Sequence, residues 1–148
     1  MEKILISACL VGDKTKYDGR SNYTPLVKQL MERYELVPFC PEVEGGLTTP
    51  RLPSEIAKNS GRVIRSDGKD VTYNYDKGAE RAWNVCKYLG IRIAILKENS
   101  PSCGVHNVYD GTFSHKLIDG QGNTTKYLKS KGITVYSENE IEEFLLTK

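Results

Sequence analysis

The sequence predicts one α/β domain in which helices cover both faces of a mainly parallel sheet. Short, almost continuously apolar runs alternate along the chain with segments of helical periodicity, which is typical of a parallel, doubly wound domain. The apolar runs lack the polar alternation of a half-exposed strand, so the sheet is expected to be the buried middle of three layers. With 148 residues and no internal repeat, residues 1–148 are expected to form a single domain.

Four apolar runs are the expected strands of this sheet. A separate β-hairpin is expected in RVIRSDGKDVTY, where two alternating runs flank Asp67 and Gly68. The loop at 42–55, EVEGGLTTPRLPSE, is interrupted by prolines and glycines and is expected to lack regular structure. Its length makes it a candidate functional loop. The sheet strands are residues 4–10 (ILISACL), 35–41 (ELVPFCP), 91–98 (IRIAILKE) and 133–138 (ITVYSE).

Helical periodicity is found in four segments. Thr24 followed by Pro25 is a favourable helix start, and apolar residues then recur at helical spacing as far as Tyr34. The other expected helices are 74–90, which stops at Gly90, 120–132, which is entered from a glycine turn, and the segment opened by a capping box of Ser137 and Glu140.

Composition narrows the class of protein. The 21 Lys and Arg residues against 19 Asp and Glu give a net charge of +2, which does not indicate a dedicated nucleic-acid or membrane-surface protein. The apolar run near the N-terminus is too short to span a bilayer and is not followed by a small-residue cleavage site. We therefore expect a cytoplasmic protein, in which disulfides are rare. The four cysteines are then core residues, ligands or catalysts.

Three of the cysteines follow predicted strands of the sheet. Cys9 ends the first strand, Cys40 ends the second, and Cys103 lies just past the third. Ligands of open α/β sheets bind outside the carboxyl ends of the strands, so we expect these three thiols at one site. Cys86 lies instead on the apolar face of the helix at 74–90, where a free cysteine packs as a small hydrophobe.

The chemistry of such a site has three possible interpretations. Three thiolates without a fourth suit an iron–sulfur cluster whose open iron acts as a Lewis acid, whereas structural zinc has four ligands and only Cys103 and His106 have a suitable short spacing. A metal-free hydrolase or transferase would instead use one nucleophilic cysteine with His106 or Glu42 as its base. A nonenzymatic nucleotide- or tRNA-binding module is the third, but the chain lacks an aromatic–basic stripe.

Polar residues of the same loops are candidates for handling a substrate. Glu42, two positions after Cys40, is a candidate general base near an apolar cleft. Ser100 lies in the turn before Cys103, where serines commonly bind backbone groups. The candidates for contacts with a polar substrate are Tyr17, Asp18, Arg20 and Ser102.

Six motifs occur along the chain in a fixed order. They are SACLVG, KYDGRSN, FCPEVEGGLTTPR, SPSCG, VYDGTFS and GITVYSE. In order and spacing they resemble the thiouracil desulfidase family, long catalogued as a domain of unknown function, and the resemblance runs nearly end to end. It implies a Rossmann-like domain with a [4Fe-4S] cluster that removes sulfur from a thiolated pyrimidine base or nucleoside, of the thiouracil or thiouridine type. Relatives that carry an additional domain act on thiolated tRNA, which makes tRNA a further possible partner.

The resemblance also implies roles for individual residues. The cluster ligands are expected to be Cys9, Cys40 and Cys103, while Glu42 activates a water and Ser100 holds or relays a proton. The implied reaction is hydrolytic and non-redox, because sulfur leaves as sulfide and a carbonyl remains. It therefore requires neither a nicotinamide nor a flavin.

Overall fold

The computed structural model describes residues 1–147 and confirms the predicted α/β fold class. Four strands form one sheet in the order β2-β1-β5-β8, and every neighbouring pair is parallel. In register, Ile4 of the central strand lies between Leu36 of β2 and Ile93 of β5. The strands are β1 (Glu2–Ser7), β2 (Tyr34–Phe39), β5 (Ile93–Leu96) and β8 (Thr134–Ser137).

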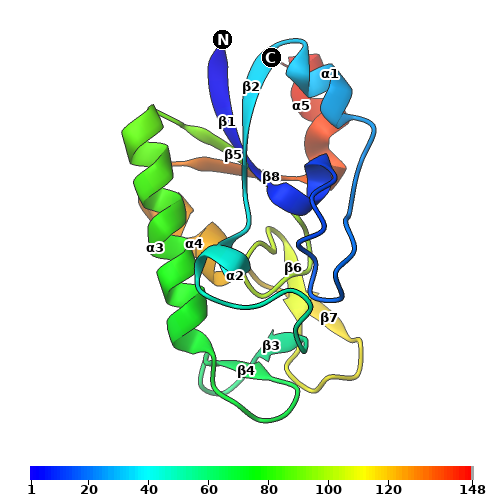
Figure 1. Ribbon diagram of the computed structural model, residues 1–148, viewed down its shortest axis with the longest axis vertical. Helices are drawn as coiled ribbons and strands as arrows, with labels where there is room; N and C mark the ends of the chain where they lie inside the picture. Colours follow the sequence, from blue (N-terminus) through cyan, green and yellow to red (C-terminus); the bar gives the residue numbers. More distant parts are fainter. Residues whose placement is uncertain (148) are drawn as a thin grey trace.

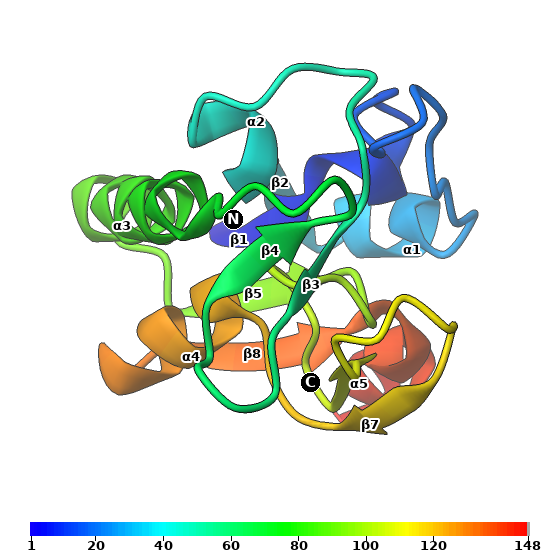
Figure 2. The same ribbon diagram turned by 90° about the horizontal axis from the view of Figure 1, so that it is seen from below.

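Two helical layers cover the sheet, one on each face (Figures 1 and 2). Successive side chains of a strand point to opposite faces, so Leu5 packs on one side and Ile4 and Ile6 pack on the other. Cys86 is fully buried in the layer that contains Leu5, as expected for a core cysteine. The first layer is α3 (Thr72–Leu89) with α4 (Asn123–Ser130), and the second is α1 (Val27–Met31) with α5 (Ile141–Thr147).

Two predicted helix signals are confirmed. Gly90 ends α3 in the left-handed conformation, with φ of 71°, which glycine adopts without a steric penalty. Ser137 and Glu140 form the expected capping box: Asn139 N–H donates to Ser137 Oγ (3.2 Å) and Ser137 N–H donates to Glu140 Oε1 (2.8 Å). The box opens a short 3-10 turn, η2 (Glu138–Glu140), from which α5 continues.

The ends of the first two strands differ from the prediction. β1 stops at Ser7, because the next residues form a 3-10 turn, η1 (Ala8–Val11), and Cys9 lies in that turn rather than in a strand. β2 stops at Phe39 and is followed by a short helix, α2 (Pro41–Glu44). The expectation that 42–55 lacks regular structure was therefore wrong at both ends. At its start, a proline in the first helical turn is compatible with helix, and at its end Ser54 and Glu55 belong to a short strand, β3 (Ser54–Ile56).

The predicted hairpin forms, and its first strand has a second partner as well. The turn lies at Asp67 and Gly68, and an antiparallel bridge between Ile64 and Asp70 joins the two runs. β4 (Val63–Arg65) also pairs antiparallel with β3 (Ser54–Ile56) from the preceding loop. The second run is shorter than expected, because the chain enters α3 at Thr72. Asp70 Oδ1 accepts a hydrogen bond from Thr72 N–H (2.9 Å), which favours a helix start over a strand.

A second small sheet was not predicted. It pairs β6 (Asn107–Tyr109) antiparallel with β7 (Leu117–Asp119). Together with α2 and the β3–β4 pair, it lies beyond the carboxyl ends of the parallel strands, in the lower half of Figure 1. Among residues 1–147, no helix has the length and apolar character needed to cross a membrane.

Candidate active site

A cavity of about 510 Å³ lies at the carboxyl edge of the parallel sheet. It lies next to the ends of β1 and β5, between which the strand order changes direction, and this is where open α/β sheets bind ligands. Figure 2 looks at the molecule from this side, where α2, the β3–β4 pair and the loops around them lie in front of the sheet. The volume is in the range of small-molecule sites.

The structure brings the three predicted cysteines to this cavity. Cys9 comes from η1, Cys40 is the residue that precedes α2, and Cys103 lies in the loop after β5. Cys103 is buried and the other two are partly exposed. The three are electrostatic neighbours, since charge on Cys40 raises the pKa of both Cys9 and Cys103. Cys86 does not line the cavity.

Burial keeps these thiols protonated in the absence of a cation. It raises the pKa of Cys103 to about 12, although hydrogen bonds from Ser102 and Ser7 act in the opposite direction. Burial also raises the pKa of Cys9 and of Cys40, and Asn22 Nδ2, 3.4 Å from Cys9 Sγ, partly offsets the shift at Cys9. A nucleophilic cysteine needs a lowered pKa, so the metal-free interpretation is disfavoured. A metal site supplies the missing positive charge and displaces the protons.

The donor set fits a cluster better than a single ion. Within residues 1–147, no three His, Cys, Asp or Glu side chains are close enough to hold one metal ion. In an iron–sulfur cube each thiolate binds a different iron, so its ligands lie further apart than the ligands of one ion. Cys9, Cys40 and Cys103 around one cavity would therefore hold a [4Fe-4S] cluster with one iron left without a protein ligand.

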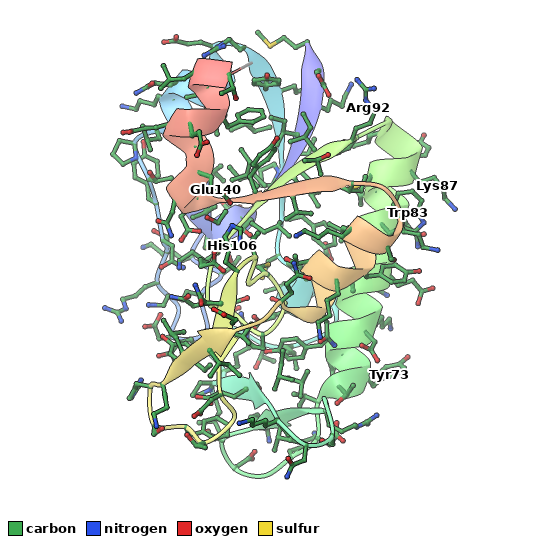
Figure 3. All side chains as sticks on the ribbon, turned by 180° about the vertical axis from the view of Figure 1, so that it is seen from behind. Tyr73, Trp83, Lys87, Arg92, His106 and Glu140 are labelled. Carbon is green, nitrogen blue, oxygen red and sulfur yellow. The ribbon has the colours of Figure 1, made fainter. Side chains whose placement is uncertain are left out.

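His106, the other candidate ligand or base, is not part of this arrangement. Its Nε2 lies 2.8 Å from Glu140 Oε1, and the two side chains lie next to each other in Figure 3. His106 is not among the residues that line the cavity. The zinc pair with Cys103 and the cysteine–histidine pair therefore both lack support from the geometry.

Glu42 is held in the cavity wall by Arg51 and Ser102, and the buried Tyr75 also hydrogen-bonds to its carboxylate. Arg51 Nε donates to its Oε1 (3.0 Å) and Ser102 Oγ donates to its Oε2 (3.0 Å). The side chains of Glu42 and Arg51 are only 13% and 8% exposed, so the pair is largely removed from water. A buried carboxylate with an arginine partner has a defined orientation, as a catalytic base requires.

The two serines form a hydrogen-bonded chain that ends at Glu42. Ser100 Oγ accepts the N–H groups of Cys103 (2.7 Å) and Ser102 (3.2 Å), which occupies both of its lone pairs. It therefore donates its own proton to Ser102 Oγ, 3.0 Å away, and Ser102 in turn donates to Glu42. Ser102, expected to contact substrate, is almost completely buried, and it links Ser100 to Glu42.

The predicted substrate loop reaches the cavity only in part. Tyr17 lines it, whereas Asp18 and Arg20 do not. Arg20 Nη2 lies 2.6 Å from Asp18 Oδ2, and Arg20 N–H donates to Asp18 Oδ1 (3.1 Å). The two side chains stabilise their own turn, and their contact with a substrate stays a prediction.

Two cationic residues of the site were missed from sequence. Arg51 binds the backbone of the opposite loop in addition to Glu42. Its side-chain Nη2 donates to the carbonyl of Thr15 (2.9 Å), and its backbone N–H donates to the carbonyl of Tyr17 (2.6 Å). Lys97 lines the cavity at the end of β5 and pairs with Glu138 (2.9 Å). A motif contains Arg51, but nothing in the sequence indicates these distant partners.

Glu98 was also missed, and it organises the loop that carries Cys103. The residue is 5% exposed and follows directly after the cavity-lining Lys97. An acidic residue at the end of an apolar run was the one available signal. Its Oε1 accepts hydrogen bonds of 2.7–3.4 Å from the backbone N–H groups of Asn99, Val105, His106 and Asn107.

Fold and site together define a parallel α/β domain with a three-cysteine cavity and an acid–serine chain in its wall. A family model described as 2-thiouracil desulfurase matches residues 4–140, and the chain belongs to this family. A solved structure described as the [4Fe-4S]-dependent thiouracil desulfidase TudS has a TM-score of 0.91 and 43% identity, covering 99% of this chain and 97% of that chain. The uncharacterized protein YbbK of Bacillus subtilis (strain 168) is 39% identical over 150 residues, 96% of this chain and 99% of that protein.

Proposed function

We propose that this protein is a [4Fe-4S]-dependent desulfidase that removes sulfur from a thiolated pyrimidine base such as thiouracil. The observation that carries the proposal is the meeting of Cys9, Cys40 and Cys103 around one cavity that also holds Glu42. Membership of the 2-thiouracil desulfurase family and the likeness to TudS support the same reaction.

The three cysteines would hold the cluster. A bound [4Fe-4S] cluster would supply a Lewis-acidic iron with a high affinity for sulfur, suited to a thiocarbonyl group. The raised pKa of each thiol means that cluster assembly releases protons. Lys97 is a cation in the cavity wall, and its charge favours the thiolate form of Cys9.

Glu42 is the residue that takes up a proton from water. Arg51 donates to one of its carboxylate oxygens and Ser102 to the other, and the carboxylate lines the cavity, where a water can reach it. The water oxygen attacks the thiocarbonyl carbon, and the C–S bond breaks with its electron pair on sulfur. The products are the carbonyl compound and sulfide, with no net change of oxidation state.

The serine chain holds Glu42 ready for this step. Ser100 donates to Ser102 Oγ, and Ser102 donates to Glu42 Oε2, so each hydroxyl proton has one direction. Glu42 lines the cavity, so the proton that it takes from water can pass across the cavity to the leaving sulfide. Ser102 is thus the serine that contacts the base, and Ser100 supports it instead of relaying the proton itself.

The proposal extends to thiouridine, to thiolated tRNA and to a cytoplasmic location. Two side chains of the cavity wall, Tyr17 and Phe113, are also exposed to solvent, so the wall reaches the protein surface, where the ribose of a nucleoside would lie. All four cysteines are free thiols, which agrees with a reducing compartment.

The test is anaerobic purification and reconstitution, followed by incubation with 2-thiouracil. We expect about four irons and four sulfides per chain, the stoichiometry of a cubane cluster. We also expect release of uracil and sulfide without an added oxidant or reductant. Cys103→Ser is expected to lose both cluster and activity, and Cys86→Ser, the matched control, only stability. A wild-type protein that stays colourless after reconstitution contradicts the proposal.

A further inference from the structure

Two exposed aromatic side chains lie at the edge of the cavity. Of the large hydrophobic side chains exposed in residues 1–147, only Tyr17 (40%) and Phe113 (37%) line it. Tyr17 belongs to the loop between η1 and α1, and Phe113 to the loop between β6 and β7. An exposed aromatic ring next to a cavity is an apolar surface that a bound ligand can cover.

Phe113 is held in its place against a backbone preference. Its φ is 56° and that of His115 is 61°, in the left-handed region that bulky residues rarely adopt. Glu55, with an exposed fraction of only 9%, offsets this, because its Oε1 accepts the N–H groups of Gly111 (2.9 Å) and Phe113 (3.1 Å). Strain that surrounding contacts enforce is typical of functional positions.

The rest of the loop is fixed as well. Asp110 Oδ1 accepts the N–H of Thr112 (2.9 Å) and its hydroxyl (2.6 Å), and Asp110 N–H donates to the carbonyl of Lys116 (2.9 Å). The rings of Tyr109 and His115 pack edge to face, with centroids 6.4 Å apart. Phe113 is therefore presented by an ordered loop, which lowers the entropic cost of using it for binding.

We propose that Phe113 and Tyr17 stack on the planar ring of a thiolated heteroaromatic base and select it over ring-saturated thiocarbonyl compounds. This inference rests on the proposed function. Neither residue contacts Glu42 or the serine chain in the hydrogen bonds of the site, so they act on binding rather than on the reacting carbon. Stacking of a base on an aromatic side chain requires only a π face and is independent of its substituents. Glu55 is a positioning residue for Phe113.

The test compares 2-thiouracil with its 5,6-dihydro derivative. The derivative keeps the thiocarbonyl and both ring N–H groups but has two saturated ring carbons, so it lacks a flat π face. Phe113→Ala is expected to raise the KM for 2-thiouracil about tenfold, with kcat changed less than about threefold. The KM for the dihydro derivative changes little, and Phe113→Trp retains the wild-type preference.

Two control variants change exposed apolar side chains near the two rings. Tyr23→Ala changes an exposed aromatic residue of the Tyr17 loop that does not line the cavity, and Leu117→Ala changes an exposed aliphatic residue at the start of β7 that does not line it either. Both are expected to leave the KM for 2-thiouracil unchanged, whereas Tyr17→Ala raises it. An equal rise in the controls, or equal KM changes for the two substrates in Phe113→Ala, overturns the inference.

Glu55 supplies an independent variant pair. Glu55→Ala removes the acceptor for the N–H of Phe113, while Glu55→Gln keeps a side-chain oxygen there. We expect Glu55→Ala to lose the preference for the planar substrate and Glu55→Gln to restore most of it. The double variant Glu55→Ala/Phe113→Ala should be no worse than Phe113→Ala, because both changes remove one interaction. Full additivity contradicts the positioning role.

Equilibrium binding separates this inference from the proposed function. The dissociation constant of uracil, which keeps the planar ring and does not react, is measured by calorimetry on the reconstituted protein. Weaker binding of uracil by Phe113→Ala supports the stacking role even if no sulfide is released from 2-thiouracil by the wild type, which would overturn the desulfidase proposal alone. Sulfide release with unchanged binding of uracil by the variant overturns the stacking role alone.

Discussion

The sheet half of the molecule is packed from apolar side chains, whereas the site half is organised by buried charged groups that bind backbone atoms. We call the four-stranded sheet with α1, α3, α4 and α5 the sheet half, and α2, the two small sheets and the cavity loops the site half. Ile4, Leu5 and Ile6 are fully buried in the first. In the second, Glu55 and Glu98 hold loops through their carboxylates.

This difference separates stability from function. Apolar burial is non-directional, so the sheet half tolerates changes that keep volume and hydrophobicity. A carboxylate that accepts several N–H groups is directional, and its removal leaves those donors unpaired at one place. Changes in the sheet half are expected to alter the free energy of unfolding, and changes in the site half to alter the cavity first.

The largest effect is expected from Glu42, the acid of the site half. Glu42→Gln keeps a side chain of the same shape with an oxygen that accepts the hydrogen bond from Ser102, but it removes the base and the negative charge beside Arg51. We expect kcat to fall by about 10²–10⁴-fold, the usual contribution of a general base, with iron content unchanged. Iron assays and sulfide release on the same sample check this. Loss of iron in Glu42→Gln would show that the residue supports the cluster instead.

A pair of variants tests the comparison directly. Leu5→Ala, in the sheet half, is expected to lower the free energy of unfolding by about 2–5 kcal/mol, because it leaves a cavity in a closely packed core. Glu98→Ala, in the site half, is expected to cost about 1–3 kcal/mol, because it leaves backbone donors unpaired. Urea unfolding gives both values, and iron is measured per folded chain.

Leu5→Ala should lose more stability than Glu98→Ala, but Glu98→Ala should lose more iron than Leu5→Ala. Leu5→Ala is expected to bind iron normally once folded, and Glu98→Ala to lose most of it, because Glu98 orders the loop of Cys103. Glu98→Gln, which keeps one acceptor oxygen, is the control for charge. Equal iron content in Leu5→Ala and Glu98→Ala would remove the distinction between the two halves.

A smaller effect on activity is expected from Arg51. Arg51→Met removes the contacts with Glu42 and with the carbonyl of Thr15, so the base loses its orientation. We expect kcat to fall about 10–100-fold with little change in KM, because a misplaced catalytic group can cost about that much. The kcat of Arg51→Lys should fall as well, since the ammonium group of lysine cannot make the several directional hydrogen bonds of the planar guanidinium group. Recovery by added guanidinium in Arg51→Met checks the role, and failure to recover argues for a purely structural one.

The smallest effect concerns Cys86 in the sheet half. Burial raises its pKa from 9.0 to about 11, so the folded chain holds this proton after the unfolded chain has lost it. The unfolded state then binds fewer protons between about pH 9 and 11, and stability falls as the pH rises through that window. The loss is about 1 kcal/mol at pH 10. Urea unfolding at pH 7 and pH 10 should show this difference between wild type and Cys86→Ala, and parallel curves would contradict it.

Local patterns of the sequence determined much of the sheet half. Apolar runs predict the four strands because a strand buried on both faces has no polar positions. The capping box at Ser137 and the glycine end at Gly90 are also local, since each involves neighbours in the chain. Strand ends were less well predicted, as at Cys9, because the turn that stops β1 has an apolar composition.

The sequence also determined that Cys9, Cys40 and Cys103 share a site. Parallel strands place their carboxyl ends at one edge, so the position of each cysteine after a strand was sufficient. Only the tertiary structure decided which polar groups surround them. The contacts of Ser102 with Glu42, of Glu55 with Phe113 and of Lys97 with Glu138 join residues 60, 58 and 41 positions apart, which no local periodicity encodes.

The same reason explains why β3 was not predicted as a partner of β4 and why the position of Asp18 and Arg20 could not be foreseen. β3 comes from the preceding loop, and its pairing with β4 depends on how that loop folds back. Asp18 and Arg20 bind each other, and whether they line the cavity depends on where their loop lies. The burial of a strand or helix follows from the periodicity of neighbouring residues, so the sequence predicts it. Directional contacts between loops depend on the completed fold, so the sequence alone does not predict them.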